Sequence, residues 1–365
     1  MVISWNLSSP SCKIFELQTE SMKKILVTGN NGYIGSVLTR MLLARGFRVV
    51  GLDTNYYEKC DFYSVESNIE QITKDIRDVS TTDLKDSYGI IHLAALSNDP
   101  LCDFNEETTY DINYKASVKL AKLAKKLRIK RFVFASSQSI YGKVANDVLV
   151  SEDHPAFPLT AYGKSKLLAE QEISKLADNS FTPVFLRPST VYGISPKLRV
   201  DIVLNNLVGW TYTTGQIKLL SDGSPWRPVI HVEDVSNAFI ACLIAPRELV
   251  HNKVFNVGEK KSFRIKEMAE LIEDVISGAN ITYSNERGSD ERSYRVNSDK
   301  FRRNLKDYYK QEWKIKKGIK NIYEGYKKHG LTLKEFTGDK YIRLNRLKKL
   351  VKEKKLNDQL RWMTK

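Results

Sequence analysis

The first half of the chain alternates short apolar runs with stretches in which apolar residues recur at helical spacing. The short runs lack polar alternation, which is typical of strands buried on both faces of a parallel sheet. The expected strands are Ile25–Thr28, Arg48–Asp53, Ile90–Leu93, Arg131–Ala135 and Val184–Arg187, with helices including Tyr33–Ala44, Ile112–Leu127 and Ala161–Leu176. This order predicts an α/β fold with a doubly wound parallel sheet.

The pattern changes after Arg187, where glycine and proline become more frequent and helices are expected at Val235–Ile244 and Ile265–Ile276. We therefore divide the chain into four parts. Residues 1–22 form a leader that we expect to be disordered, and residues 23–187 form the sheet domain. Residues 188–330 form mainly a smaller α/β lobe, and residues 331–365 form a basic helical extension.

The net charge of +15 is concentrated late, in segments such as Lys310–Lys320 and Arg343–Lys355. We interpret these segments as a solvated, lysine-rich surface and expect no specific nucleic-acid partner. No apolar run is long enough to span a bilayer. The four cysteines are scattered, which favours a reducing, cytoplasmic setting without a disulfide framework or metal site.

A glycine-rich turn stands between the first strand and the first helix and reads Gly29-Asn-Asn31-Gly32-Tyr33-Ile34-Gly35. Glycines allow the backbone to approach a pyrophosphate, which the helix N-terminus then stabilises. Asp53 ends the second strand, where a carboxylate binds ribose hydroxyls and repels a 2′-phosphate. The pattern therefore predicts a Rossmann-type domain that binds NAD rather than NADP.

Two further strand ends are expected to border the same cofactor. Asp75 and Ile76 lie at the end of a further predicted strand that precedes Ile90–Leu93. Leu93, Ala94 and Ala95 lie at the end of the strand Ile90–Leu93. Small residues at these positions allow a dinucleotide to lie across the strand ends.

A Tyr-x-x-x-Lys pair, Tyr162 and Lys166, lies on one face of a predicted helix. An ammonium near a phenol lowers its pKa, so Tyr162 can remove a proton from a hydroxyl as hydride leaves the same carbon. A serine-rich strand end lies upstream and can steady the same oxygen. We favour Ser137 for this role, and Ser136 and Ser139 remain alternatives.

Together these motifs resemble the extended short-chain dehydrogenase/reductases that act on nucleotide-linked sugars, including UDP-glucose 4-epimerase. The resemblance covers roughly residues 23–326 and implies cofactor contacts by Tyr162, Lys166 and Pro188. It implies a nucleotide-diphosphate sugar as substrate, bound by Ser139, Thr190, Arg227, Arg292 and Arg295. It also implies a homodimer built through the helices Ile112–Leu127 and Ala161–Leu176.

The chain departs from the 4,6-dehydratases of this family at Gln138 and Ser139, where those enzymes carry an Asp-Glu pair. We therefore expect an NAD-dependent epimerase-like enzyme of surface-polysaccharide or sugar biosynthesis that abstracts hydride at a ring carbon, C4, through a keto intermediate. A keto-sugar reductase or dehydratase is the alternative within the family. A non-catalytic NAD- or RNA-binding protein on the same fold is the alternative outside it.

Overall fold

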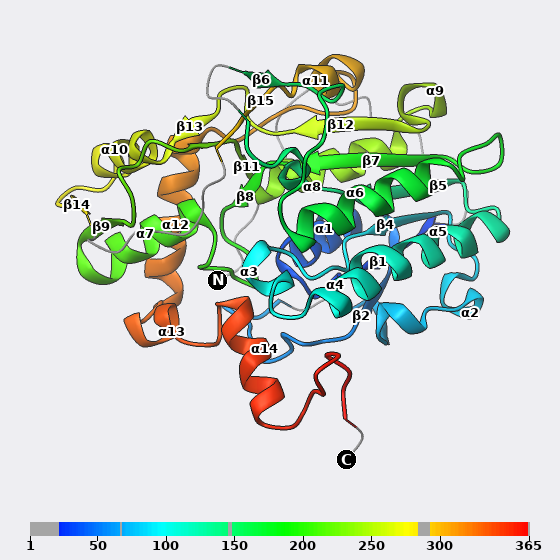
Figure 1. The fold of residues 1–365 in the computed structure, drawn as a ribbon, viewed down its shortest axis with the longest axis horizontal. Helices are drawn as coiled ribbons and strands as arrows, with labels where there is room; N and C mark the ends of the chain where they lie inside the picture. Colours follow the sequence, from blue (N-terminus) through cyan, green and yellow to red (C-terminus); the bar gives the residue numbers. More distant parts are fainter. Residues whose placement is uncertain (1–21, 66–67, 145–147, 284–292, 364–365) are drawn as a thin grey trace.

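A parallel sheet of seven strands forms the centre of the computed structural model, which describes residues 22–65, 68–144, 148–283 and 293–363 (Figure 1). The strand order is β12-β7-β5-β4-β1-β2-β3. The strands are β1 (Lys24–Thr28), β2 (Arg48–Asp53), β3 (Glu70–Thr73), β4 (Gly89–His92), β5 (Arg131–Ala135), β7 (Pro183–Pro188) and β12 (Lys253–Val257). The expected α/β fold with a doubly wound parallel sheet is confirmed, and all five expected strands are present within a residue or two.

Helices cover both faces of this sheet because successive strand side chains point to opposite sides. Leu26 faces α5 (Ala116–Lys126) and α6 (Ala161–Ser174), whereas Ile25 and Val27 face α1 (Tyr33–Leu43) and α8 (Val232–Ile244). The predicted helix Ile112–Leu127 begins with a π-helical turn, η2 (Asp111–Lys115), before α5 continues it.

A second, smaller lobe lies beside the carboxyl ends of the strands and has its own apolar core (Figure 1). It contains α7 (Val203–Thr214), β9 (Gln216–Leu219), α10 (Ile265–Val275), β14 (Asn280–Tyr283) and α12 (Ile315–His329). Short strand pairs border it, formed by β8 (Thr190–Tyr192) with β11 (Val229–His231) and by β10 (Trp226–Arg227) with β13 (Phe263–Arg264).

Residues 23–187 and residues 188–330, which we separated by sequence, both contribute to the central sheet and its covering helices. Strand β12 comes from residues 188–330 but pairs in parallel with β7 in the central sheet. Helix α8 comes from the same range and packs on α1 and the sheet. Both elements are almost wholly apolar on the face that they bury, so they join the larger core.

The basic C-terminal extension contains α13 (Leu333–Thr337) and α14 (Arg343–Lys352) and returns to the sheet domain (Figure 1). Leu347 and Leu350 are buried in the same apolar core as α5 and α6. Our interpretation of Arg343–Lys355 as a solvated surface is therefore wrong for one face of α14. Lys348 and Lys349 on the other face are exposed.

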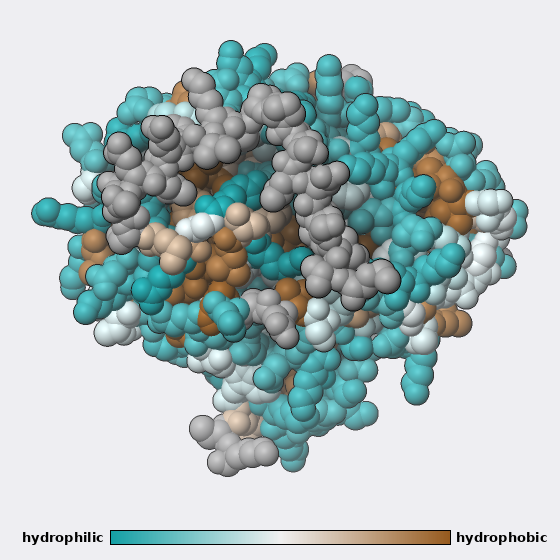
Figure 2. All heavy atoms as spheres, turned by 180° about the vertical axis from the view of Figure 1, so that it is seen from behind, coloured by the Kyte–Doolittle hydropathy of each residue, from teal (hydrophilic) through white to brown (hydrophobic). Residues whose placement is uncertain are grey.

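The remaining short elements lie in connections: η1 (Ile76–Asp78), α2 (Thr81–Leu84), α3 (Asp99–Cys102), α4 (Glu106–Tyr110), η3 (Gln138–Tyr141), β6 (Leu149–Val150), α9 (Arg247–Val250), β15 (Arg295–Val296) and α11 (Asp299–Asn304). Across the described ranges, no helix combines the length and the apolar character that a membrane crossing requires. The face seen in Figure 2 is predominantly hydrophilic. The predicted leader lies outside the described residues, apart from Met22.

Candidate active site

A cleft of about 350 Å³ lies at the carboxyl ends of β1, β2, β4 and β5, where a doubly wound sheet binds its ligands. Residues of the sheet domain form most of its wall, and Arg227 from β10 and Arg343 from α14 complete it. Most of the residues that the sequence placed at the site border this one cleft: Gly29, Gly32, Tyr33, Ile34, Asp53, Asp75, Ile76, Leu93, Ala94, Ala95, Ser137, Ser139, Tyr162, Lys166, Pro188, Thr190 and Arg227.

The turn between β1 and α1 is built so tightly that side chains are excluded. Gly29 has a φ of +76°, and a Cβ atom there would lie 2.7 Å from the backbone nitrogen of Ala94. A Cβ atom on Gly35 would lie 2.1 Å from the carbonyl oxygen of Gly29. Helix α1 therefore begins directly at the cleft, and its first N–H groups are available to an anion.

Asp53 is held in place by backbone groups at the end of β2. Its two carboxylate oxygens accept hydrogen bonds from the backbone N–H groups of Asn31, at 3.1 Å, and Asn55, at 2.8 Å. Burial nevertheless raises the pKa of Asp53. Asn31 does not line the cleft, because its side chain turns away to donate to Asn55. Asn31 supports Asp53 through its backbone N–H, and its contact with the cofactor stays a prediction.

Asp75 lies on the same side of the cleft, at the start of η1. Its carboxylate accepts hydrogen bonds from the backbone N–H and the guanidinium of Arg77. Ile76 and Leu93 add apolar wall around this half of the cleft. The adenosine half of a dinucleotide therefore meets a surface that combines fixed carboxylates with apolar side chains.

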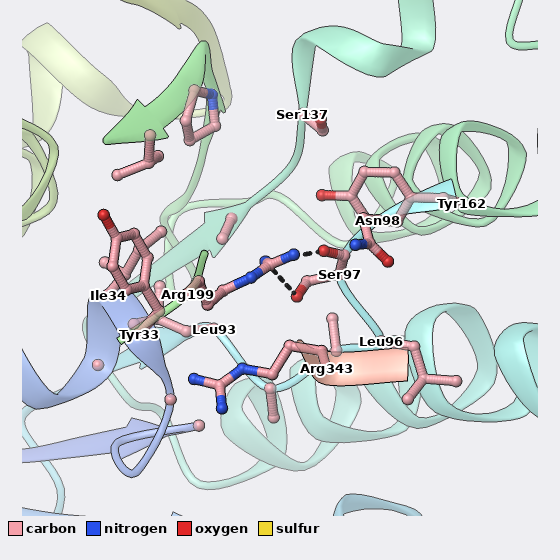
Figure 3. Close-up of a pocket in the computed structure, with 18 of the residues that line it drawn as sticks. Tyr33, Ile34, Leu93, Leu96, Ser97, Asn98, Ser137, Tyr162, Arg199 and Arg343 are labelled. Atoms are coloured by element: carbon pink, nitrogen blue, oxygen red, sulfur yellow. Dashed lines mark hydrogen bonds between the residues drawn. The ribbon is translucent and has the colours of Figure 1, made fainter. Parts of the chain in front are cut away.

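Tyr162 and Ser137 lie together on the opposite wall, on α6 and at the end of β5 (Figure 3). The N-terminus of α6 is fixed by Thr160, whose hydroxyl accepts a hydrogen bond from the Gly163 N–H at 3.3 Å. Burial raises the pKa of Tyr162 to about 12, and the neighbouring Ser137 hydroxyl lowers it in part. The Ser137 hydroxyl accepts a hydrogen bond from the Ser139 N–H at 3.1 Å, whereas the Ser136 hydroxyl is buried without a partner among the described residues.

Lys166 lies one helical turn after Tyr162, and its Nζ donates to the carbonyl oxygen of Ala135 at 2.7 Å. Burial lowers the pKa of Lys166 to about 8. The raised pKa of Tyr162 runs against our expectation that Lys166 brings it toward neutrality. The ammonium is held by β5, and burial of the phenol dominates.

Three residues that we predicted to bind the substrate, Ser139, Thr190 and Arg227, line the cleft, as does Pro188, which we predicted to contact the cofactor. Arg227 is 5% exposed, and its Nη1 donates to the carbonyl oxygen of Trp226 at 3.0 Å.

Arg295 lies outside this lining, because its guanidinium packs over the Trp226 ring, 5.1 Å from the centroid. Its neighbour Tyr294 borders the cleft instead, as the alternation of side chains along a strand dictates. Our placement of Arg295 at the substrate therefore receives no support from its contacts. Arg292 lies outside the described residues.

The sequence did not reveal two arginines of the cleft. Arg199 forms paired hydrogen bonds with Asp201, at 2.9 and 3.0 Å, and donates to the Ser97 carbonyl oxygen at 3.0 Å (Figure 3). Arg343 reaches the cleft from α14. Arg199 and Asp201 stand two residues apart in an otherwise apolar stretch, which is the signal that could have identified a buried pair.

These features fit a dinucleotide. The glycine turn leaves room for a pyrophosphate, and Asp53 stands where the adenosine ribose would lie. Arg343 is 3% exposed, and its Nη1 has no hydrogen-bond partner among the described residues. The cleft thus combines a space for phosphates with a buried cationic donor.

Comparisons with known proteins agree with this geometry. Residues 25–258 match the model of the NAD dependent epimerase/dehydratase family. A putative UDP-glucose 4-epimerase of Methanocaldococcus jannaschii is 29% identical over 84% of this chain and 100% of its own length. The UDP-glucose 4-epimerase of Bacillus subtilis is 27% identical over 82% of this chain and 94% of its own.

Among solved structures, UDP-glucuronic acid 4-epimerase from Bacillus cereus, in complex with UDP-glucuronic acid and NAD, is similar, with a TM-score of 0.71. It is 26% identical, and the match covers 84% of this chain and 99% of that one. The expected family and the expected cofactor, NAD, are confirmed. The chain therefore belongs to the NAD dependent epimerase/dehydratase family and is an NAD-dependent enzyme of the short-chain dehydrogenase/reductase type.

Proposed function

We propose that this enzyme epimerises a nucleoside-diphosphate sugar at C4 through a keto intermediate. The observation that carries the proposal is that Tyr162 and Ser137 lie together on one wall of the cofactor cleft (Figure 3). Relatives named as UDP-glucose 4-epimerases and a similar structure that holds UDP-glucuronic acid support this class of substrate.

Bound NAD supplies the hydride acceptor, and the protein supplies proton transfer and orientation. Tyr162 takes the proton of the sugar hydroxyl as the C–H bond breaks, and Ser137 donates a hydrogen bond to the same oxygen as it becomes a carbonyl. Burial raises the pKa of the phenol, and the positive charge of bound oxidised NAD would lower it and favour Tyr162 as a base.

Arg227 is the group that we assign to the sugar-nucleotide diphosphate. Arg227 is buried and lines the cleft, and the next residue, Pro228, accepts a backbone hydrogen bond from Thr190 at 3.1 Å. A guanidinium forms short, charge-assisted hydrogen bonds with phosphate oxygens. The sugar would then lie between Arg227 and Tyr162.

Epimerisation is favoured over dehydration by the residues that follow Ser137. Gln138 is buried outside the cleft lining, where its Nε2 donates to the carbonyl oxygen of Arg187 at 3.1 Å. Ser139 lines the cleft with a hydroxyl, which is not a carboxylic acid. Neither residue can protonate a leaving hydroxyl as a carboxylic acid would.

The proposal is tested with UDP-glucose and UDP-glucuronic acid that carry deuterium at C4. We expect inversion at C4 by proton NMR, with the label retained because the same hydride returns. Tyr162→Phe should lower turnover by about 10² to 10⁴-fold. Tyr283→Phe, on a tyrosine that is 58% exposed outside the cleft, is the matched control.

Three results would contradict the proposal. Near-normal turnover of Tyr162→Phe would remove the proposed base. Release of NADH together with a keto sugar, without an epimer, would indicate a keto-sugar reductase running in reverse. Uptake of solvent deuterium at the neighbouring C5 would indicate dehydratase chemistry.

A further inference from the structure

The C-terminal segment, residues 331–363, is attached along the loop that follows β2. Trp362 donates from Nε1 to the carbonyl oxygen of Thr54 at 2.6 Å, and Arg346 donates to the carbonyl oxygen of Tyr56 at 3.4 Å. Tyr56 in turn donates to the carbonyl oxygen of Leu360. This loop begins at Asp53, so the segment is fixed to the adenosine side of the cleft.

Helix α14 places Arg343 at its first position, and the side chain enters the cleft. Its Nη2 donates to the carbonyl oxygen of Lys197 at 2.7 Å, and its guanidinium lies 4.0 Å from the centroid of the Tyr57 ring. In Figure 3 the guanidinium points toward the turn that leads into α1, which carries Tyr33 and Ile34. These contacts fix the plane of the guanidinium, and Nη1 is left without a hydrogen-bond partner among the described residues.

A guanidinium in this position is costly without an anion. Arg343 is 3% exposed, and its Nη1 lacks a partner among the described residues. Its charged neighbour Arg199 is already engaged by Asp201. Burial of a charged donor that lacks an acceptor costs free energy, and a phosphate oxygen would remove that cost.

We propose that Arg343 binds the pyrophosphate of NAD, so that the C-terminal segment completes the cofactor site from outside the sheet domain. This inference rests on the NAD dependence of the family and is independent of the sugar chemistry proposed above. The pyrophosphate is favoured over a 2′-phosphate because the carboxylate of Asp53 would repel the latter. Arg343 also borders the same space as Gly29 and Gly32, where a pyrophosphate is expected.

Arg343 lies beyond the residues that the family model matches. UDP-glucuronic acid 4-epimerase from Bacillus cereus is covered over 99% of its length, whereas this chain is covered over 84%. The family model ends at residue 258, well before α14. Arg343 therefore lies outside the part of the chain that the family model describes.

The test is calorimetric titration of protein freed of cofactor with adenosine, ADP, NAD and NADP. Arg343→Gln should weaken ADP and NAD binding on the order of tenfold to a hundredfold, as expected for one hydrogen bond to a charged group. Adenosine affinity should change less than about twofold. Arg343→Lys should restore part of the lost affinity, because the positive charge returns without the paired donors of a guanidinium.

Lys352→Gln is the matched control, because it removes a positive charge from an exposed position of the same helix, outside the cleft lining. Equal ADP affinity in wild type and Arg343→Gln would overturn the proposal. Equal losses for adenosine and ADP would assign Arg343 a purely structural role, and a loss confined to NADP would assign it to a 2′-phosphate. Equal NAD affinity in wild type and Arg343→Gln would likewise overturn the proposal for Arg343. The assignment of the chain as an NAD-dependent enzyme would still stand.

If Arg343→Gln fails to fold, the comparison of Arg343→Lys with wild type still decides the matter. The proposal is supported if Arg343→Lys loses more affinity for ADP than for adenosine, each compared with wild type. It is overturned if the ratio of ADP affinity to adenosine affinity is the same in the two proteins. Thermal unfolding with and without NAD provides a second readout, since a ligand stabilises the folded state in proportion to its affinity.

Discussion

Glu259 carries a buried carboxyl outside the cleft, where it accepts a hydrogen bond from the Tyr192 hydroxyl at 2.6 Å. Burial raises the pKa of Glu259 from its ordinary value of 4.5 to about 7. The folded state therefore binds a proton that the unfolded state releases between these pH values. Its contribution to stability is full below pH 4.5 and is lost as the pH rises toward 7.

Glu259→Gln should remove this dependence, because an amide cannot ionise and its oxygen can still accept from Tyr192. Relative to wild type, the variant should gain stability as the pH rises from 4.5 to 7, on the order of 3 kcal/mol by the end of that range. Denaturant unfolding of both proteins at several pH values provides the measurement. A constant difference in the free energy of unfolding would show that Glu259 titrates normally.

The comparison with wild type is necessary because two buried histidines act in the opposite direction. Burial lowers the pKa of His92 and of His231 to about 3, so their contribution to stability is present above pH 6.5 and is lost as the pH falls toward 3. These contributions are common to both proteins and cancel in the difference. In wild type alone, the stability lost through Glu259 as the pH rises can therefore be offset by the stability gained through the two histidines.

At the scale of single elements, α14 is the case in which a basic sequence hides an apolar face. Leu347 is fully buried against the core of α5 and α6. Leu347→Ala should destabilise the protein by about 2–4 kcal/mol. It should also weaken NAD binding if α14 holds Arg343 in the cleft. Lys348→Ala on the exposed face should change stability by less than about 0.5 kcal/mol.

Denaturant unfolding and NAD titration of the two α14 variants give these values. An unchanged free energy of unfolding in Leu347→Ala would mean that α14 does not pack on the core. A destabilised variant with unchanged NAD affinity would separate the packing of the helix from the cofactor site.

The elements that the sequence predicted well are those with strong local signals. The glycine turn, the buried strands and the position of Tyr162 depend on residues close together in the chain, so pattern and spacing suffice. Strand β12 gave a weaker signal, because Lys253–Val257 is short and lies among loop-rich sequence. Its place next to β7 is a tertiary contact that local pattern does not encode.

The same reason explains the site residues that sequence reasoning missed. Arg343 reaches the cleft only because α14 packs back on the sheet domain, nearly 300 residues after Asp53. Arg295 shows the converse: its position in the chain suited the cleft, but its guanidinium packs over Trp226 while Tyr294 lines the cleft, so its contact with the substrate stays a prediction. The pKa of Tyr162 could not be predicted from the Tyr-x-x-x-Lys spacing, since burial outweighs the neighbouring charge.

At the scale of the whole molecule, we expect a homodimer formed through α5 and α6. Leu168 on α6 is 37% exposed. It lies on the face of the helix opposite the catalytic pair. Two-fold pairing of these helices would cover this apolar surface. Light scattering at micromolar concentration should give twice the chain mass of 41.8 kDa.

Leu168→Asp should shift the light-scattering mass toward that of a single chain, because the dimer would bury an uncompensated carboxylate. Leu333→Asp, on a leucine that is 45% exposed in α13, should leave the mass unchanged, since we expect the basic C-terminal helices to lie outside the interface. A wild type with the mass of one chain across this concentration range would refute the dimer and leave the catalytic proposal intact.

The return of β12 and α8 to the central sheet limits how the substrate lobe could be exchanged between relatives. A graft that replaced everything after residue 188 would remove the edge strand beside β7 and the helix that covers α1. A working chimera should instead keep residues 229–257 from the recipient and import two separate windows, one before β11 and one after β12. If the smaller lobe determines substrate preference, we expect that preference to be transferred only when both windows are exchanged together. A single crossover at residue 188 should not produce a new specificity.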